Sequence, residues 1–326
     1  MKVLFSGYRD QRHSSAGGYD KIAGFPGGAY ISDKDVPFGF IKVGRRGKII
    51  NLLCLDLSTR ILRCKYDITH MFYGDTIVFP YKKLRKHKLV ATIHLDVTKH
   101  IKGQRLFIRA LKNLDGVVVL SSSQERQLKE MGIKAKFIPH GFSRPKFNYL
   151  KPKSFCAQNL DERINIVMSG TNYRDMSILM SSVEYSEKNV LGITFHIMGL
   201  RDEKMICELR KHNNVICYDR LTDDEYFSVI KSCDYNFMPL TFATANNALL
   251  EAQFLGIQSI LPDISGVDDY AAPFPLNLFY RDISDLYNIL SILQKRGVSE
   301  PLIKYSERFL WDNIYKELKE YYEGLI

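Results

Sequence analysis

The chain has 326 residues, 45% hydrophobic and 25% charged, so it is long enough for two domains that each bury a core. No segment approaches the roughly 20 consecutive apolar residues that span a bilayer, and the start, MKVLFSGYRD, lacks the apolar stretch of a signal peptide, so we expect a cytoplasmic protein. The six cysteines are widely spaced without a C-x-x-C pair, which favours reduced thiols over disulfides or zinc.

The charge is divided unevenly along the chain. Residues 1–160 contain 30 Lys and Arg against 11 Asp and Glu, a net +19, whereas residues 161–326 contain 16 against 25, a net −9. The basic residues of the first half cluster in Lys42–Lys48, Lys82–Lys88 and Lys99–Arg109. Any one cluster is compatible with a solvated surface, but the asymmetry indicates an interaction surface for nucleic acid, an anionic membrane or a phosphorylated acceptor.

The first predicted strand, Lys2–Ser6, leads into a turn rich in glycine and small polar residues. In this turn Gly17 and Gly18 precede a short predicted helix, Tyr19–Ala23. The turn matches neither common glycine-rich phosphate motif, so a plain surface loop is equally compatible with it. The D-x-D sequence Asp33-Lys34-Asp35 resembles a magnesium-diphosphate motif, but no apolar strand precedes it, and we interpret it as a turn.

Further strands are predicted over Lys48–Leu57, within Asp67–Val78 and over Leu89–Ile93. His94 directly follows the last of them. A histidine at the carboxyl end of a parallel strand lies at the edge where such sheets bind ligands, and it can transfer protons near neutral pH. A packing or surface role is equally compatible with the sequence.

The first half closes with four more elements and a linker. These are a helix over Gln104–Leu111, a strand over Gly116–Ser121, a helix over Ser122–Met131 and a strand within KAKFIPHGF. The Pro- and Lys-bearing stretch Arg144–Ser154 then reads as a domain boundary.

The second half opens with a strand, Ile164–Met168, and a polar turn that contains Gly170, Asn172 and Arg174. An arginine after such a strand can bind a diphosphate through paired N–H donors, and a surface ion pair is the alternative. Strands at Ile193–Met198 and Asn214–Cys217 flank a charged helix, and Thr222 is placed to cap the next helix.

A strand–turn–helix–strand unit follows from Asp234 to Gly266. Its strands are Tyr235–Leu240 and Gln258–Leu261, and the helix is expected to begin among Thr244, Ala245, Asn246 and Asn247 and to end at Gly256. Glu251 lies one helical turn after Asn247 on the same face. The free amides at the helix start favour phosphate and a carboxylate can accept both ribose hydroxyls, so this unit suits a nucleotide. The alternative is a structural unit with Glu251 in solvent.

The run ANNALLEAQFLGIQSIL resembles the nucleotide-sugar motif of glycosyltransferase family 4, whose members have two Rossmann-like domains in the GT-B architecture. The resemblance implies that Glu251 binds the donor ribose. The family often carries a second glutamate eight positions earlier, where this chain has Ala243, which puts the contribution of that first glutamate in doubt.

Other candidate site residues follow from the same resemblance. Gly17 and Gly18 look like the family's Gly-Gly pair in the first loop, His94 and Asp96 line its acceptor and sugar pocket, and Arg174 binds the donor pyrophosphate. The family's base-binding loop corresponds to Arg220 and Leu221. The remaining candidates for the donor site are Gly170, Asn172, Thr244, Ala245, Asn246 and Asn247.

The expected architecture is α/β, with two Rossmann-like domains facing each other across a cleft: residues 1–150 for the acceptor and 155–305 for the nucleotide-sugar. Residues 306–326 are expected to form an amphipathic helix that crosses back to the first domain. The resemblance implies a glycosyltransferase that retains the anomeric configuration. Arg174 and the helix amides near Asn246 would stabilise the leaving diphosphate in place of a metal, so no cofactor is expected.

The charge of the first half suggests a lipid-linked or polysaccharide acceptor and a peripheral position on an anionic membrane. Two alternatives stay open: a nucleotide-sugar epimerase of the same architecture, and a non-enzymatic nucleic-acid-binding protein. The epimerase would need carboxylates that converge on the sugar. The basic half lacks the aromatic–basic interleaving of a single-strand platform, so no nucleic acid is expected as a partner.

Overall fold

A computed structural model of the chain describes residues 1–8, 14–35, 44–76, 81, 84–96, 105–150, 152 and 162–326. For residues 44–49, 105 and 106 it describes the backbone alone. The three predicted basic clusters lie only partly within these residues, because 42–43, 82–83 and 97–104 are outside them.

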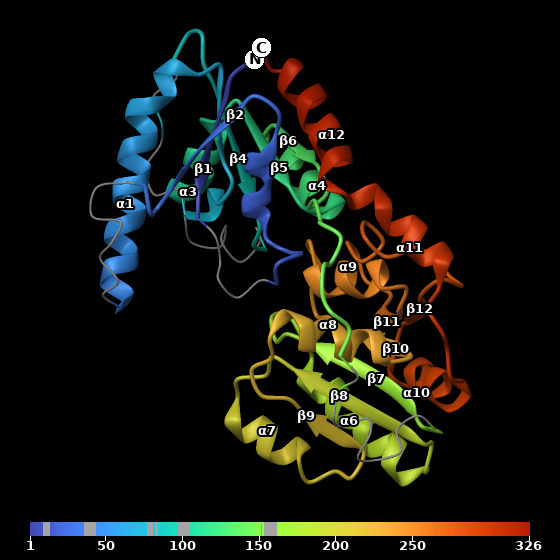
Figure 1. Ribbon diagram of the computed structural model, residues 1–326. Helices are drawn as coiled ribbons and strands as arrows, with labels where there is room; N and C mark the ends of the chain where they lie inside the picture. Colours follow the sequence, from blue (N-terminus) through green and yellow to red (C-terminus); the bar gives the residue numbers. More distant parts are fainter. Residues whose placement is uncertain are drawn as a thin grey trace. The chain divides into compact units, whose positions relative to one another are not determined.

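The described chain divides into two compact units, each built around one sheet (Figure 1). The first unit contains Met1–His13, Gly18–Phe142 and Phe309–Ile326. The second contains Ser143–Arg308 together with the short segment Ser14–Gly17. The end of the chain therefore groups with the first unit, although it follows the whole of the second in sequence.

The first unit has a six-stranded parallel sheet in the order β2-β1-β3-β4-β5-β6. Its elements in chain order are β1 (Val3–Gly7), a 3-10 helix (Tyr19–Gly24), β2 (Gly28–Ser32), α1 (Gly44–Leu62), a 3-10 turn (Arg63–Lys65), β3 (Ile68–Met71), a 3-10 turn (Gly74–Thr76), β4 (Lys88–Ile93), α3 (Arg105–Lys112), β5 (Gly116–Val119), α4 (Ser122–Glu130), β6 (Ala135–Phe137) and, after the second unit, α12 (Trp311–Glu323). The strand order reverses between β1 and β3.

One predicted strand in this unit is wrong. Lys48–Leu57 lies within α1, a 19-residue helix. The run KIINLLCLDL satisfies the apolar pattern of a buried strand, but Leu55 and Thr59, four residues apart, are the buried positions. This spacing matches a helix that packs one face, against Leu4 and Ile31 of β1 and β2.

Helix α12 is attached to the sheet of the first unit through a buried polar network. The phenol oxygen of Tyr322 lies 2.5 Å from Nδ1 of His70 on β3, and the Nε2 atom of that histidine lies 2.7 Å from the Thr92 hydroxyl on β4. Burial lowers the pKa of His70 to about 3, so the ring is neutral and one of its nitrogens can accept a hydrogen bond. The helix is thus part of the core of this unit, as its buried Ile314, Leu318 and Tyr322 also show.

The second unit has a second parallel sheet, ordered β12-β11-β10-β7-β8-β9. Its elements are β7 (Ile164–Ser169), α6 (Met176–Lys188), β8 (Ile193–Met198), α7 (Glu203–Leu209), β9 (Val215–Cys217), α8 (Asp223–Ser232), β10 (Tyr235–Phe237), α9 (Asn247–Phe254), β11 (Gln258–Pro262), β12 (Leu278–Tyr280), α10 (Ile283–Ile292), α11 (Glu300–Ser306) and a 3-10 turn (Glu307–Phe309) that reaches the boundary of the units.

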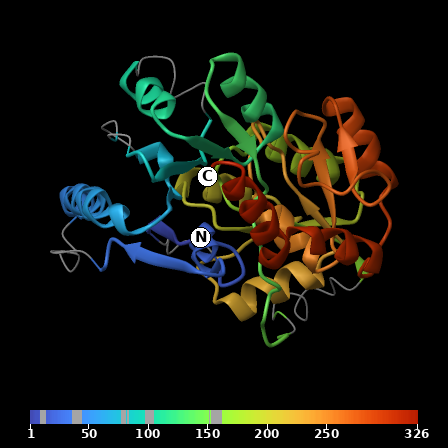
Figure 2. The same cartoon turned by 90° about the horizontal axis from the view of Figure 1, so that it is seen from above.

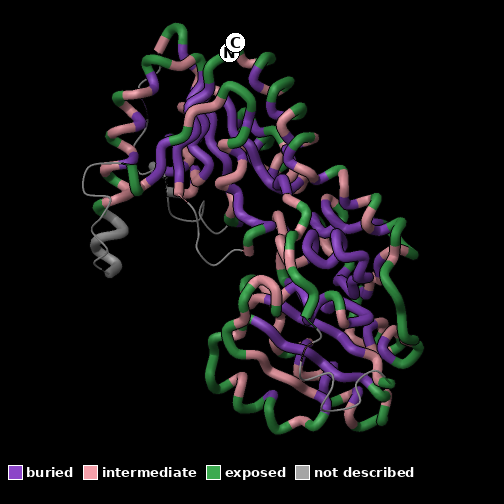
Figure 3. Tube along the Cα trace, viewed as in Figure 1, coloured by how far each residue is buried: buried purple, intermediate pink, exposed green. Residues whose placement is uncertain are grey.

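The order of the second sheet creates a topological switch point. The chain starts at β7 in the middle, runs outward through β8 and β9, and then returns to place β10 on the other side of β7. In α/β sheets, the carboxyl ends of the strands at such a switch point are where ligands bind. Here the loops after β7 and β10 are joined to each other, because the N–H of Asp175 donates to Pro239 and the N–H of Thr241 donates to Tyr173. The inner strands of both sheets are buried along nearly their whole length, as Figure 3 shows, which explains their near-continuous apolar sequences.

In the described part of the chain, no helix combines the length and the apolar content needed to cross a membrane.

The structure predicts that Gly141→Ala destabilises the first unit. A methyl group at Gly141 would overlap the indole ring of Trp311, a buried residue that opens α12. The ring is rigid and packed, so we expect a loss of about 1–3 kcal/mol in the free energy of unfolding. Gly297→Ala is the control, because nothing lies within 4 Å of that added carbon. Urea unfolding of the two variants measures the difference, and equal midpoints would contradict the prediction.

Candidate functional site

The candidate site lies at the carboxyl edge of the second sheet, at its switch point. Ser169 ends β7 and leads to Gly170, and the loop after β10 leads to α9, which begins at Asn247. Helix α8 contributes Tyr226 from the same side. Parallel strands bring these loops together although they are far apart in sequence.

The first turn of α9 has no side-chain cap. The N-cap is Asn246, within the predicted range, and its side chain makes no capping hydrogen bond. The N-termini of α6, α7 and α8 in the same unit are capped by Asp175, Asp202 and Thr222. The buried side-chain oxygen of Asn247 also has no hydrogen-bond partner. Uncapped amides with a partial positive charge at this place favour an anion.

Glu251, one turn into α9, is buried with 3% of its surface exposed. The alternative that it faces solvent is therefore wrong. Its two carboxylate oxygens each accept a hydrogen bond from a hydroxyl: one from Ser14 at 2.5 Å and the other from Tyr226 at 2.6 Å. Ser14 belongs to the second unit, so this arrangement lies within one compact unit.

Burial raises the pKa of Glu251 to about 7, while the hydrogen bonds from Ser14 and Tyr226 partly oppose this shift. A carboxylate with two hydroxyl donors, one on each oxygen, has the bonding pattern that a vicinal diol would supply. The group is therefore suited to bind a sugar diol, provided that the diol replaces at least one of the present donors. Tyr226 is also 3.1 Å from the Ser169 hydroxyl, which fixes the phenol at the strand end.

Arg174 is the positive group of this site. It follows β7 in the turn before α6, and its guanidinium donates to the backbone oxygens of Ser169 and Asn172 at 3.0 and 2.9 Å. Its buried Nε–H has no partner, and among the described residues no carboxylate forms an ion pair with it. Burial lowers the pKa of Arg174 to about 10, yet the group stays charged at neutral pH. A buried cation without a counter-ion is costly unless an anion binds beside it.

Glycine is favoured at two positions close to Arg174, one in its own turn and one directly after β8. Gly170 and Gly199 have φ values of +77° and +76°, and a side chain at Gly199 would contact the backbone nitrogen of Gly170. Asn172 is exposed, and Tyr173 adopts φ +55°. The backbone of this turn is thus held in a tight conformation next to the arginine.

The Ser14–Gly17 segment lies against α8 and α9. The backbone N–H of Ser15 donates to Asp223, and a side chain at Gly17 would contact the Asn247 amide. Gly18, with φ +105°, is already part of the first unit, so the predicted glycine pair is divided between the two units.

The remaining predicted donor residues lie in two loops of the second unit. Arg220 is exposed and Leu221 half-buried, just before α8, where Thr222 and Glu225 form a reciprocal cap. Thr244 and Ala245 are half-buried in the loop before α9, and Ala243 is buried.

His94 lies in the first unit, directly after β4 as predicted. Its Nε2 atom is 2.6 Å from the backbone oxygen of Phe72, which assigns the proton to Nε2. Asp75 accepts hydrogen bonds from the backbone N–H groups of His94 and Leu95 and so fixes this loop. Asp96, two residues further, is buried.

Two other predictions can be placed. Asp33-Lys34-Asp35 is a turn, in which Asp35 accepts hydrogen bonds from the backbone and hydroxyl of Ser32. Within the described ranges no group of three or more His, Cys, Asp or Glu side chains is arranged to hold a metal.

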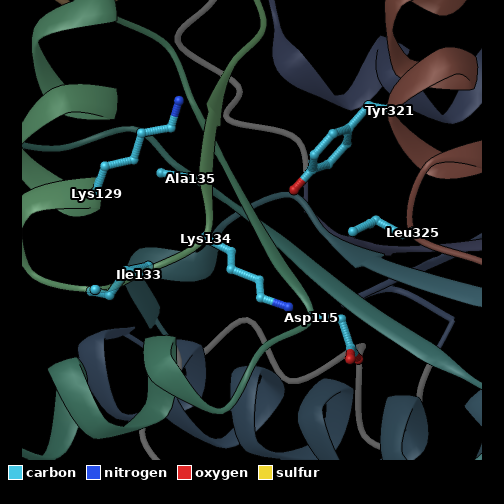
Figure 4. Close-up of a pocket in the computed structure, with 8 residues that line it drawn as sticks. Asp115, Lys129, Ile133, Lys134, Ala135, Tyr321 and Leu325 are labelled. Atoms are coloured by element: carbon cyan, nitrogen blue, oxygen red, sulfur yellow. The ribbon is translucent and has the colours of Figure 1, made fainter.

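One cavity of about 460 Å³ lies elsewhere (Figure 4). It is an open, mostly apolar hollow at the amino ends of β5 and β6, beside the end of α12. Asp115, Lys134 and Tyr321 are among its lining residues. None of the candidate site residues lines it, and in α/β sheets ligands bind at the opposite, carboxyl ends of the strands. We therefore place the site at the switch point and not in this cavity.

Sequence patterns did not identify Ser14 and Tyr226 as partners of Glu251, or Ser169 as a partner of Tyr226. Serine and tyrosine are common in loops and on helices, and their spacing in sequence has no relation to their positions around Glu251. Of these three residues, only Ser169 could have been selected from the sequence, because it directly follows a predicted strand and precedes a glycine.

The raised pKa of Glu251 predicts a pH dependence of stability. In the folded protein Glu251 keeps its proton up to about pH 7. In the unfolded chain it keeps the proton only up to about pH 4.5, its ordinary pKa. The contribution of Glu251 to the free energy of unfolding is therefore complete below pH 4.5. It is lost as the pH rises through 7, and the total loss is roughly 3 kcal/mol. In Glu251→Gln this loss is absent.

Urea unfolding at pH 5 and pH 8 measures this effect. Wild type should lose more stability between the two pH values than Glu251→Gln does. The control is Glu184→Gln, at an exposed position of α6, which should follow wild type. Parallel behaviour of wild type and Glu251→Gln would show that Glu251 has an ordinary pKa.

No protein-family model and no curated protein matches the sequence. Solved structures match along nearly the whole chain. Sucrose-phosphate synthase from Thermosynechococcus elongatus covers 100% of this chain and 99% of its own, with a TM-score of 0.71 and 15% identity. HepE from Anabaena, in complex with UDP, covers 99% and 100% with a TM-score of 0.72 and 12% identity. The lipopolysaccharide outer core galactosyltransferase WaaB, in its apo form, covers 100% of both chains with a TM-score of 0.68 and 16% identity. Identities this low show the fold alone: the chain has the predicted α/β fold of GT-B glycosyltransferases.

Proposed function

We propose that the protein is a glycosyltransferase that transfers a sugar, of hexose type, from a nucleotide-sugar donor. The observation that carries this proposal is the combination of three groups at one switch point: a buried carboxylate, a half-buried arginine without a counter-ion among the described residues, and an uncapped helix start. A ribose diol on Glu251, with a diphosphate on Arg174 and the α9 amides, would satisfy all three groups at once.

Structural neighbours support the choice of ligand class. The Anabaena HepE structures were obtained with UDP and with UDP-glucose. Within our proposal, Gly170 and Asn172 contact the diphosphate from the β7 turn, and Thr244 to Asn247 contact it from the α9 turn. Arg220 and Leu221 present backbone groups to the base.

The proposed reaction forms a bond from an acceptor hydroxyl oxygen to the anomeric carbon and breaks the bond from that carbon to the diphosphate. The nucleoside diphosphate leaves with the electron pair. Arg174 and the α9 amides would stabilise the charge that develops on it, in a mechanism without a metal. We assign the acceptor to residues 1–150, where His94 would receive the acceptor proton at Nδ1, since Nε2 already carries one. The donor is assigned to residues 155–305, with residues 306–326 returning to the first domain.

The stereochemistry of transfer, the acceptor and the location of the protein are proposed from the sequence alone. Resemblance to glycosyltransferase family 4 suggests a reaction that retains the anomeric configuration. The net charge of +19 in residues 1–160 suggests a lipid-linked or polysaccharide acceptor and a protein that works in the cytoplasm at an anionic membrane surface.

A panel of nucleoside diphosphates and nucleotide-sugars tests donor binding by thermal shift. At 100 times its Kd, the bound compound stabilises the folded protein by about 2.7 kcal/mol. We expect one base to be preferred and Glu251→Ala to abolish the response, because the ribose loses its acceptor. Glu184→Ala, on the surface of α6, should respond like wild type. An unchanged response of Glu251→Ala would remove this carboxylate from the ribose site.

Arg174→Ala tests the proposed role in catalysis. Because the positive charge is used when the diphosphate leaves, we expect kcat for release of the nucleoside diphosphate to fall by about 10²–10³. The exposed Arg201→Ala is the matched control. A loss confined to KM, with kcat unchanged, would show that Arg174 only binds the donor.

A further inference from the structure

Both oxygens of the Glu251 carboxylate are already bonded in the structure. The Ser14 hydroxyl donates to Oε1 at 2.5 Å, and the Tyr226 phenol donates to Oε2 at 2.6 Å. Only 3% of the glutamate surface is exposed. A ribose diol can therefore reach this carboxylate only if one of the two hydroxyl groups moves away.

Tyr226 is the fixed partner of the two. It lies in the first turn of α8, where its backbone N–H donates to the Thr222 carbonyl at 2.8 Å. Its hydroxyl also lies 3.1 Å from the Ser169 hydroxyl at the end of β7. Helices α8 and α9 lie side by side in the second unit, as Figures 1 and 2 show. Movement of the phenol away from Glu251 would also separate it from Ser169.

Ser14 belongs to a short segment that forms neither helix nor strand. We call this segment, Ser14–Gly17, the Ser14 strap. The backbone N–H of Ser15 donates to Asp223 at the start of α8 at 2.8 Å. The N–H of Gly17 donates to the Ser14 hydroxyl at 3.1 Å, within the strap itself. The strap can therefore release α8 and α9 without the loss of any backbone hydrogen bond of a helix or a strand.

The Ser14 strap also lies against the start of α9. A side chain at Gly17 would come within 3.0 Å of the Asn247 amide nitrogen, so the absence of a side chain permits this close approach. The N-terminus of α9 has no side-chain cap, and the buried side-chain oxygen of Asn247 has no hydrogen-bond partner. The strap thus lies beside both groups that are proposed to bind the donor, the carboxylate of Glu251 and the amides of α9.

We infer that the Ser14 hydroxyl occupies the place of a ribose hydroxyl and is displaced by the donor, whereas Tyr226 stays bonded to Glu251 and positions it. This inference rests on the proposed donor site and adds to it a contact that competes with the donor. The exchange of one hydroxyl for another leaves no oxygen of Glu251 unsatisfied. The apparent affinity for the donor is reduced by the fraction of molecules in which the strap is closed.

Titration calorimetry of the full chain with UDP tests the competition. Ser14→Ala should bind UDP more tightly than wild type, on the order of tenfold, because the ribose no longer displaces a hydrogen bond to a charged group. Ser14→Thr keeps the hydroxyl and should bind like wild type. Without ligand, Ser14→Ala should unfold at a lower urea concentration, because Glu251 has lost a donor. General damage to the fold would weaken binding and stability together.

Tyr226→Phe should have the opposite effect on affinity. It removes the hydroxyl that positions Glu251, so we expect weaker UDP binding, on the order of tenfold. Ser284→Ala is the control for both variants. Ser284 is exposed on α10, and its variant should bind UDP and unfold like wild type.

Hydrogen exchange with and without UDP follows the strap directly. UDP should speed exchange in the peptide that contains Ser15, whose N–H loses Asp223, and slow exchange at the start of α9. Equal or weaker UDP binding by Ser14→Ala, or slower exchange of the strap with UDP, would overturn this inference alone, provided that Glu251→Ala still abolishes binding. If no nucleoside diphosphate binds, or if Glu251→Ala binds like wild type, the proposed donor site fails and this inference fails with it.

Discussion

The site depends on the high cost of burying polar groups without partners. Glu251 is buried and Arg174 is half-buried at the switch point of the second sheet, but they do not pair with each other in the described hydrogen bonds or ion pairs. The carboxylate is satisfied by two hydroxyls and keeps a raised pKa, and the guanidinium retains a buried N–H without a partner. Such an arrangement lowers the stability of the free protein. A bound ligand offsets this loss of stability when it supplies the missing charge and hydrogen bonds.

The surrounding fold explains why these groups can be held in such positions. The turn after β7 is fixed by Gly170 and Gly199, and Tyr226 is fixed between Ser169 and Glu251. The sheet below them holds a large apolar cluster, and its buried polar side chains, such as Asn165, His196 and Asn236, form hydrogen bonds with one another or with their neighbours. A rigid base with a few strained or unsatisfied groups at its edge is a common basis for binding sites.

The first unit likewise combines a packed sheet with polar residues just past the carboxyl ends of its strands. The network of His70, Thr92 and Tyr322 anchors the last helix to the sheet, while His94 and Asp75 lie just past the strand ends.

The sequence alone determined the order of most strands and helices, because parallel strands buried on both faces read as short apolar runs between glycine-rich turns. It also placed the start of α9 and the position of Glu251, since capping residues and helical spacing are local properties. The strand predicted over Lys48–Leu57 was wrong because a short apolar run fits a strand and a helix equally well, and only packing against Leu4 and Ile31 decides between them.

Tertiary structure alone decided the burial of Glu251, its hydroxyl partners Ser14 and Tyr226, and the missing counter-ion of Arg174. These are contacts between residues up to 237 positions apart, and no local pattern encodes them.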